Sequence, residues 1–200
     1  MALANLFPWS RYRDDQPRTV FIGDSITAFW SAVAPRWFRP GWINKGVSGD
    51  TTAQMLARFS ADVLAARPRV VHIMGGTNDL WRGMPGAGAA TSIANIGAMI
   101  QLARANRIAV VLAAPPPIGA QAEQMFEYPD FFPALRDGIE RHARAFGVIH
   151  VDYARALARS GALKRQYTTD GIHLTSAGYR AMRGHAEAAI RKAAAATQSA

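Results

Sequence analysis

Five short apolar runs alternate along the chain with stretches of helical periodicity, and this alternation constrains the fold more than any other feature. The first run contains Val20-Phe21-Ile22, which is continuously apolar, as expected of a strand covered on both faces. Strands that alternate with helices form a parallel sheet with helices on both of its faces. The five runs are Arg18–Gly23, Trp42–Lys45, Arg69–Met74, Ile108–Ala113 and Val148–Val151. The sequence therefore predicts an α/β fold, a three-layer α/β/α sandwich around a five-stranded parallel sheet.

Helical segments are predicted after each run, and they suggest one domain. They begin near Ile26 and cover Asp50 or Thr51 to Ala66, Thr91–Asn106, Phe132–Phe146, Ala154–Ser160 and Ser176–Ala195. A flavodoxin-like strand order, 2-1-3-4-5, would place the ends of the first three strands side by side. No repeat or internal linker divides the 200 residues. We expect a single domain over residues 1–200, with an N-terminal arm at 1–17 and a polar tail at 196–200.

Composition narrows the class of protein. The chain has no cysteine, so it has neither a disulfide nor a thiolate nucleophile. Its first residues do not form a signal peptide, and the uncharged stretch from 83 to 103 is too polar for a membrane span. We expect a cytoplasmic protein. The net charge of +9 comes mostly from arginines scattered singly, which is typical of a solvated surface, so no nucleic-acid partner is expected.

The first strand ends in Gly23-Asp24-Ser25, which packing alone explains poorly. In open α/β sheets, ligands and chemistry collect at the carboxyl ends of the strands. We therefore hypothesise that Ser25 is a nucleophile. A neutral serine is a weak nucleophile and needs a base within hydrogen-bond reach, a group that orients this base and donors for the oxyanion.

The candidate base is His173, in Asp170-Gly171-Ile172-His173. A spacing of three residues, in a turn or one helical pitch, lets the Asp170 carboxylate reach the imidazole. Asp170 would then hold the tautomer of His173 and stabilise the imidazolium. The other histidines form no pair at i,i+4 spacing, so neither a metal nor another cofactor is expected.

Candidate oxyanion donors follow the first three strands. They are the backbone N–H of Ser25 at a helix start, the backbone N–H of Gly46 and the side-chain amide of Asn78. Asp24 and Asp79 flank these positions, and we expect them to support the site through hydrogen bonds to loop backbone.

Four blocks together make the sequence resemble the SGNH, or GDSL-like, hydrolase superfamily. They are Gly23-Asp24-Ser25, Gly46, Gly76-Thr77-Asn78-Asp79 and Asp170-Gly171-Ile172-His173, in this order. The resemblance implies the SGNH fold, with Ser25 as nucleophile, His173 as base and Asp170 orienting it. It also implies an oxyanion hole formed by Ser25, Gly46 and Asn78. The Gly-x-Ser-x-Gly elbow of the α/β-hydrolases is absent.

The sequence thus favours a metal-independent serine hydrolase that cleaves a small-molecule carboxylic ester through an acyl-enzyme on Ser25. Candidate substrates are short-chain acyl esters, acetylated sugars, lysophospholipids and thioesters. Two alternatives stay open, a phosphatase-like enzyme that binds anions at strand-end glycines and a non-catalytic basic binding module. Residues that could line an apolar acyl pocket, or equally pack in the core, are Trp30, Trp81, Met84, Met125, Phe126 and Tyr128.

Overall fold

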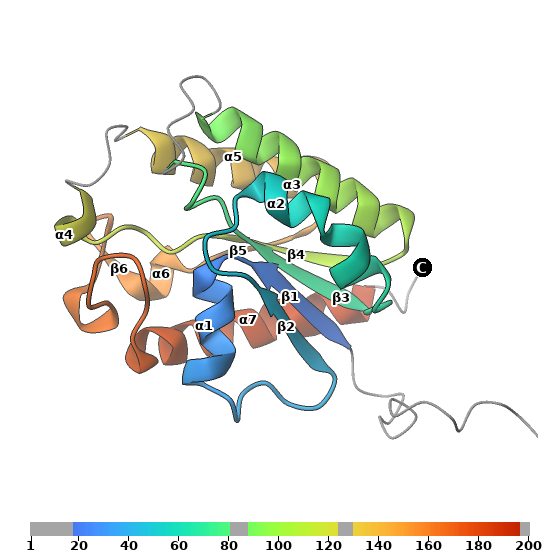
Figure 1. Cartoon of the computed structure of the whole chain (residues 1–200), viewed down its shortest axis with the longest axis horizontal. Coiled ribbons are helices and arrows are strands. Elements are labelled where there is room, and N and C mark those ends of the chain that lie inside the picture. Colours follow the sequence, from blue (N-terminus) through green and yellow to red (C-terminus); the bar gives the residue numbers. More distant parts are fainter. Residues whose placement is uncertain (1–17, 81–87, 124–129, 197–200) are drawn as a thin grey trace, which may run out of the picture.

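The protein has three layers, with a parallel five-stranded sheet in the middle (Figure 1). The computed structural model describes residues 18–80, 88–123 and 130–196. The strands are β1 (Thr19–Gly23), β2 (Trp42–Gly46), β3 (Val70–Met74), β4 (Ala109–Ala114) and β5 (Ile149–Asp152). Their order is β2-β1-β3-β4-β5 and all neighbours are parallel, which confirms the predicted α/β fold and strand order.

The helices form one layer on each side of the sheet. They are α1 (Ser25–Val33), α2 (Thr52–Ala57), α3 (Gly88–Ala105), α4 (Ala120–Glu123), α5 (Phe131–Phe146), α6 (Ala154–Leu157) and α7 (Ser176–Ala196). In Figure 1, α1 and α7 lie on one side of the sheet, and α2, α3 and α5 lie on the other. Within the described residues, no helix is long and apolar enough to cross a membrane.

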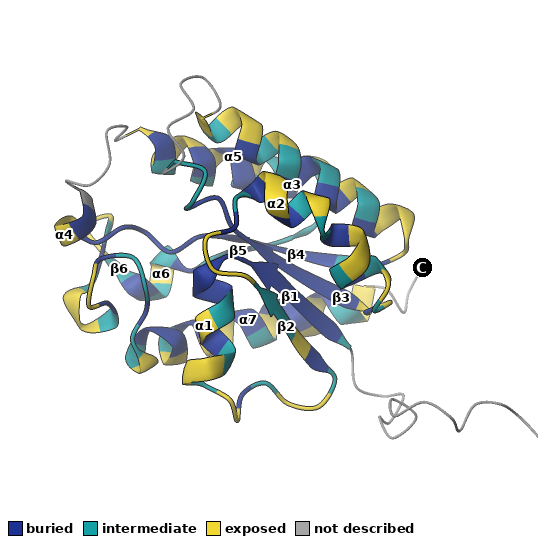
Figure 2. Ribbon diagram, in the orientation of Figure 1, coloured by how far each residue is buried: buried dark blue, intermediate teal, exposed yellow. Residues whose placement is uncertain are grey.

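Both faces of the central strands are buried, which explains their continuous apolar sequence (Figure 2). Phe21 of β1 belongs to the core beneath α1 and α7. Val20 and Ile22, its neighbours in the strand, belong to the core beneath α2, α3 and α5. Successive side chains therefore enter opposite layers, as the geometry of a strand requires.

The helix predicted up to Ala66 is interrupted in the structure. α2 ends at Ala57, and after Arg58 the chain forms a π-helix, η3 (Ser60–Leu64). The N–H of Ala65 donates to the carbonyl of Ser60, five residues earlier, at 3.0 Å. The apolar periodicity of this segment does not distinguish an α-turn from a π-turn.

The helix predicted up to Ser160 was also too long. α6 stops at Leu157, and a short antiparallel hairpin follows, formed by β6 (Ala158–Arg159) and β7 (Ala162–Leu163). Ser160 and Gly161 occupy the turn with φ of 52° and 84°. Positive φ at both central residues is the geometry of a two-residue hairpin. A 3₁₀ turn, η4 (Arg165–Tyr167), then leads toward α7.

Trp30, named from the sequence as a possible pocket residue, lies in the core. Its exposed fraction is 0%, and its ring stacks on Trp37 with centroids 4.4 Å apart and on Tyr179 with centroids 5.7 Å apart. The other five possible pocket residues, the N-terminal arm and residues 197–200 of the predicted tail lie outside the described residues.

We predict that Trp30→Ala lowers the free energy of unfolding by about 3–5 kcal/mol, because a fully buried tryptophan leaves a large cavity. Val33→Ala, one turn further along α1 at a site 38% exposed, is the control and should cost less than about 1 kcal/mol. Urea unfolding measures both. Equal losses would show that the Trp30 side chain does not support the core.

Candidate active site

Three strand ends meet at one edge of the sheet. β1 lies between β2 and β3, with Gly23 paired to Gly46 on one side and to Met74 on the other. The chain segments that follow these strands therefore start side by side. They contain Ser25, the loop from 47 to 51 and the loop from 75 to 79.

Ser25 is the first residue of α1. The Asp24 side chain caps this helix by accepting from the Ile26 N–H at 2.9 Å. The first turn of a helix leaves its N–H groups without intrahelical acceptors, so the Ser25 N–H points out of the helix start. The Oγ of Ser25 lies 2.9 Å from Nε2 of His173, which comes from the other end of the chain.

Asp170 and His173 form a compact turn before α7. The Nδ1 of His173 lies 2.6 Å from Oδ2 of Asp170, while Oδ1 accepts from the backbone N–H of His173 at 2.8 Å and of Ile172 at 2.9 Å. Gly171 has φ of 89°, which permits this tight turn. Burial tends to raise the pKa of Asp170, but these hydrogen bonds outweigh it and lower the pKa to about 2.

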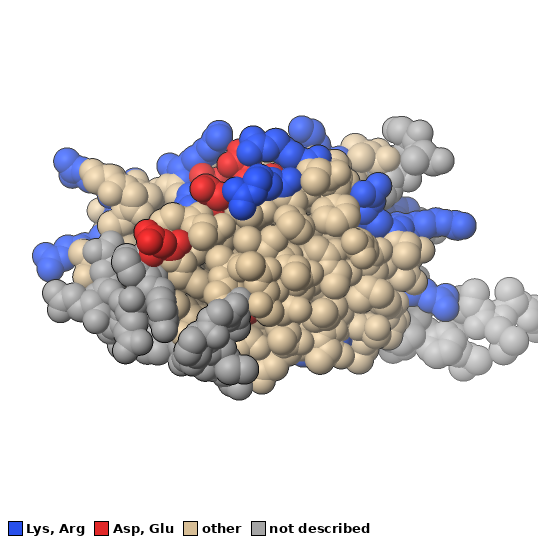
Figure 3. All heavy atoms as spheres, turned by 90° about the horizontal axis from the view of Figure 1, so that it is seen from above, with Lys and Arg blue, Asp and Glu red and all other residues tan. Residues whose placement is uncertain are grey.

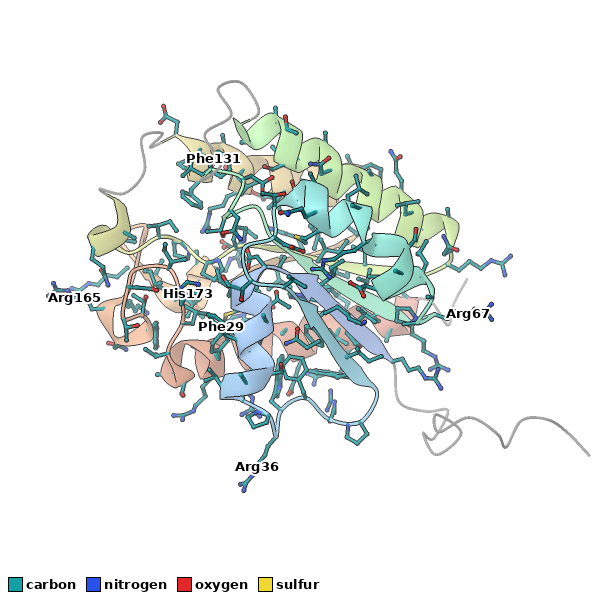
Figure 4. All side chains as sticks on the ribbon, in the orientation of Figure 1. Phe29, Arg36, Arg67, Phe131, Arg165 and His173 are labelled. Atoms are coloured by element: carbon teal, nitrogen blue, oxygen red, sulfur yellow. The ribbon has the colours of Figure 1, made fainter. Side chains whose placement is uncertain are left out.

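The turn that bears His173 is held against α1. The phenol of Tyr179, in α7, donates to the carbonyl of Ile26 at 2.8 Å. The ring centroids of Phe29 and His173 lie 5.2 Å apart, and Figure 4 shows the two labelled residues close together beside α1. Phe29 is 40% exposed, so its ring also offers an apolar surface beside the histidine.

The structure places Asn78 at the predicted edge, where its Nδ2 donates to the carbonyl of Asp50 at 2.9 Å. A side-chain amide has two N–H groups, so this contact leaves one of them for a ligand.

Gly46 does not fit the predicted role. Its N–H already donates to Oδ1 of Asn44 at 2.8 Å, so it is not free for an oxyanion. The absence of a side chain has a packing reason instead, because a Cβ here would lie 2.2 Å from the backbone nitrogen of Ala28. Gly49, three residues later, has φ of 84°, and its N–H has no acceptor in the described part of the chain. Gly49 is therefore a candidate oxyanion donor. The sequence Gly46-Val47-Ser48-Gly49 contains it, but our sequence reasoning named only the first glycine.

Asp79 ties the Asn78 loop to two helices. Its carboxylate accepts from the backbone N–H of Thr52 at 3.0 Å, from the Thr52 hydroxyl and from the Ser92 hydroxyl at 2.9 Å. These contacts fix the start of α2 and the first turns of α3 relative to Asn78. The sequence predicted contacts to loop backbone, whereas these contacts go to one backbone N–H and two hydroxyls at the starts of helices.

Asp24 is the other flanking carboxyl and is only 1% exposed. Its Oδ2 has no hydrogen-bond partner among the described residues. Burial raises the pKa of Asp24 to about 6, and the nearby Asp79 adds to this effect while the Ile26 N–H and His173 oppose it.

His72, in β3, is a core histidine with only one of its two ring nitrogens hydrogen-bonded among the described residues. Its Nε2 lies 2.8 Å from the phenol oxygen of Tyr153, but its Nδ1 has no partner in the described structure. Burial lowers the pKa of His72 to about 3. Across residues 18–80, 88–123 and 130–196, no three or more His, Asp and Glu side chains gather in a way that could hold a metal ion.

A cavity of about 880 Å³ lies away from this constellation. Its lining includes Arg18, Phe38, Arg39, Trp42 and Arg67, at the amino ends of β1 and β2. It is thus at the opposite end of the strands from Ser25. We place the candidate active site at the contacts among Ser25, His173 and Asp170, and not at this cavity.

Comparison with known proteins agrees with this geometry. The sequence matches the model of the GDSL-like Lipase/Acylhydrolase family over residues 21–181. It is 30% identical to an arylesterase of Vibrio mimicus over 109 residues, which are 54% of each chain. It is 50% identical to an acetylxylan esterase of Geobacillus stearothermophilus over 40 residues, 20% of this chain and 18% of the esterase. The matches thus span about half of one curated relative and less than a fifth of the other.

Two solved structures are similar over nearly the whole chain. A GDSL-like lipase from Bacteroides thetaiotaomicron superposes with a TM-score of 0.81 and 34% identity, covering 88% of this chain and 89% of the lipase. A candidate acylhydrolase from Bacteroides fragilis superposes with a TM-score of 0.82 and 31% identity, covering 97% and 99% of the two chains.

The raised pKa of Asp24 predicts a specific dependence of stability on pH. Because the folded-state pKa of about 6 exceeds the ordinary value of 3.8, the folded protein holds the proton more tightly. This contribution is fully present below about pH 4 and is lost as the pH rises through 6. Asp24→Asn keeps the cap oxygen and cannot ionise. Its free energy of unfolding relative to wild type should therefore rise by about 2–3 kcal/mol between pH 4 and pH 8.

Urea unfolding at both pH values measures this difference. Gln101→Ala, at an exposed site on α3, is the control: it changes no titratable group, so its stability relative to wild type should stay constant. If Asp24→Asn and wild type lose stability in parallel, the Asp24 carboxyl does not carry the proton that we assign to it.

Proposed function

The chain belongs to the GDSL-like lipase/acylhydrolase family, and on this premise we propose that it is a serine hydrolase that cleaves carboxylic esters through an acyl-enzyme on Ser25. One observation carries the proposal. Ser25 Oγ lies 2.9 Å from His173 Nε2, and His173 Nδ1 lies 2.6 Å from Asp170 Oδ2. A hydroxyl, an imidazole and a carboxylate in this order can activate the hydroxyl for attack.

In the first half of the reaction, Ser25 Oγ attacks the carbonyl carbon of the ester and His173 Nε2 takes the hydroxyl proton. Asp170 accepts from the Nδ1–H of His173 and stabilises the imidazolium. The C–O bond to the leaving group then breaks, and His173 returns the proton to the departing alcohol. In the second half, water attacks the acyl-enzyme and His173 again transfers the proton, which releases the acid and restores the Ser25 hydroxyl.

The tetrahedral intermediates need donors for their oxyanion. We assign this role to the Ser25 N–H, the free N–H of the Asn78 side chain and the Gly49 N–H, with Gly49 in place of Gly46. Two observations support the assignment. The Asn78 amide contacts the carbonyl of Asp50, which directly follows Gly49, and the Gly49 N–H has no other acceptor among the described residues.

For the substrate, the names of the two curated relatives put acetyl and aryl esters first among the candidates. The half-exposed Phe29 ring beside His173 supports an apolar group on one side of the ester. The surface that Figure 3 shows does not support the alternative of a non-catalytic basic binding module. There, acidic side chains lie among the basic ones at one border and a broad middle area carries neither charge.

We predict that a fluorophosphonate probe labels Ser25 and that labelling is lost in His173→Ala, because the serine then has no base. His185→Ala is the matched control, since His185 is an exposed histidine on α7, away from the described contacts of Ser25. Mass spectrometry of the adduct identifies the labelled residue. A folded wild-type protein that neither takes the probe nor hydrolyses acetyl or aryl esters would refute the proposal.

We further predict that Asn78→Ala lowers kcat by about 10²–10³ with little change in KM, because one oxyanion donor is removed. Asn106→Ala is the control, since this asparagine also donates one side-chain hydrogen bond to a carbonyl, that of Leu102, far from Ser25. Steady-state kinetics on an aryl acetate give both values. Unchanged turnover in Asn78→Ala would remove Asn78 from the oxyanion hole.

A further inference from the structure

The side chain of Arg58 connects several parts of the proposed site, although nothing in the sequence singled it out. Its guanidinium makes four hydrogen bonds from a position that is only 19% exposed. The acceptors are Asp50 Oδ2 at 2.6 Å, Asp62 Oδ2 at 2.6 Å, the Lys45 carbonyl at 2.7 Å and the Gly23 carbonyl at 3.0 Å. Two of these acceptors are main-chain carbonyls at the ends of neighbouring strands, so the contacts cannot be a surface ion pair alone.

Arg58 stands where the helix is interrupted. It follows α2 directly, with φ of −96° and ψ of 1°, and the π-helix η3 begins two residues later. Interruptions of this kind occur frequently at functional sites because they redirect side chains. Asp62, on the first turn of η3, accepts from Arg58 and also from Lys45 at 3.0 Å. The carboxylates of Asp50 and Asp62 therefore balance the charge of Arg58. Its guanidinium also donates to the carbonyls at the strand ends.

Two of the other contacts, those to Gly23 and Asp50, lead to the two sides of the oxyanion hole. Gly23 directly precedes Asp24 and Ser25, and its carbonyl also accepts from the Val47 N–H at 3.0 Å. Asp50 directly follows Gly49, and its carbonyl accepts from the Asn78 amide. One planar guanidinium thus bonds both the strand that delivers the Ser25 N–H and the loop that delivers the Gly49 N–H.

We propose that Arg58 is a positioning residue for the oxyanion hole, which fixes the Gly49 and Asn78 donors at a set distance from the Ser25 N–H. This inference rests on the proposed function, because it assumes that these donors bind an oxyanion. Arg58 acts through Asp50 and Gly23 and does not itself contact the substrate. Lysine cannot replace it, because an ammonium lacks the planar fork of five N–H donors that reaches four acceptors at once.

The expected effect is on turnover. Displacing a catalytic group by about 1 Å can cost about 10²-fold in rate. Arg58→Lys should therefore lower kcat by about 10–10²-fold on an aryl acetate and leave KM within about threefold, because donors that act in the transition state are misplaced. Lys45→Met is the matched control. It removes the other cation bound to Asp62 and leaves the bonds from Arg58 to Gly23 and Asp50, so kcat should stay near the wild-type value.

A double variant separates positioning from a general loss of structure. If Arg58 acts on the same hole as Asn78, the combined loss of kcat in Arg58→Lys/Asn78→Ala is smaller than the product of the two single losses. A loss equal to that product would overturn the inference. So would an Arg58→Lys enzyme with wild-type kcat, or one in which only KM changes.

Paired variants keep the inference testable if Arg58 variants do not fold. Asp50→Ala and Asp62→Ala each remove one carboxylate bonded to Arg58, but only Asp50 belongs to the oxyanion loop. We expect kcat to fall at least tenfold more in Asp50→Ala than in Asp62→Ala, and equal losses would overturn the inference. An inactive wild-type protein without label on Ser25 would refute the proposed function, whereas an active, labelled wild type with these negative results would refute the role of Arg58 alone.

Discussion

Gly23 of β1 lies in register with Gly46 of β2 and Met74 of β3, and this pairing decides where each part of the proposed site can lie. A slip of one residue in either ladder would shift a strand end by about 3.3 Å and turn its side chains to the other face. The Asn78 amide would then lose the Asp50 carbonyl, and the Gly49 N–H would move away from the Ser25 N–H. The two glycines help to fix the register, because a Cβ on Gly23 would overlap the Thr27 side chain and a Cβ on Gly46 would overlap the backbone of Ala28.

Two carboxyl groups near Ser25 are shifted in opposite directions, and their surroundings explain their different roles. Asp24 lies in the core with one oxygen unpartnered, so burial dominates and its pKa rises. Asp170 lies in a half-exposed turn, where His173 and two backbone N–H groups contact its oxygens and its pKa falls. Asp170 therefore stays charged well below neutral pH and can stabilise an imidazolium. Asp24 accepts only the Ile26 N–H in the described structure, and with this bond it caps α1, the helix that begins at Ser25.

Local sequence patterns predicted the strands and the residues that lie together at Ser25. Features that depend on tertiary contacts could not be predicted from the sequence. Continuous apolar runs located all five strands to within one residue at each end. The glycines were harder, because Gly46 and Gly49 look alike in sequence, and only the Asn44 contact shows which N–H is occupied. Arg58 was missed because its four acceptors come from three separate segments, and helical periodicity does not reveal the π-turn that follows it.

The contact between Ser25 and His173 joins residues 148 positions apart, so its length depends on how α1 and α7 pack. Tyr179 of α7 bonds the first turn of α1 through Ile26, and its ring stacks on Trp30 one turn further along. Phe29, on the outer side of α1, meets the ring of His173 itself. Aromatic contacts on both sides of α1 thus hold this helix against the His173 ring and against α7. Because a close-packed core transmits small changes in side-chain volume, we expect a change at Trp30 to alter the distance between Ser25 and His173. If Ser25 and His173 act as proposed, the buried aromatic cluster acts on catalysis through the packing of two helices, although Trp30 itself lies in the core.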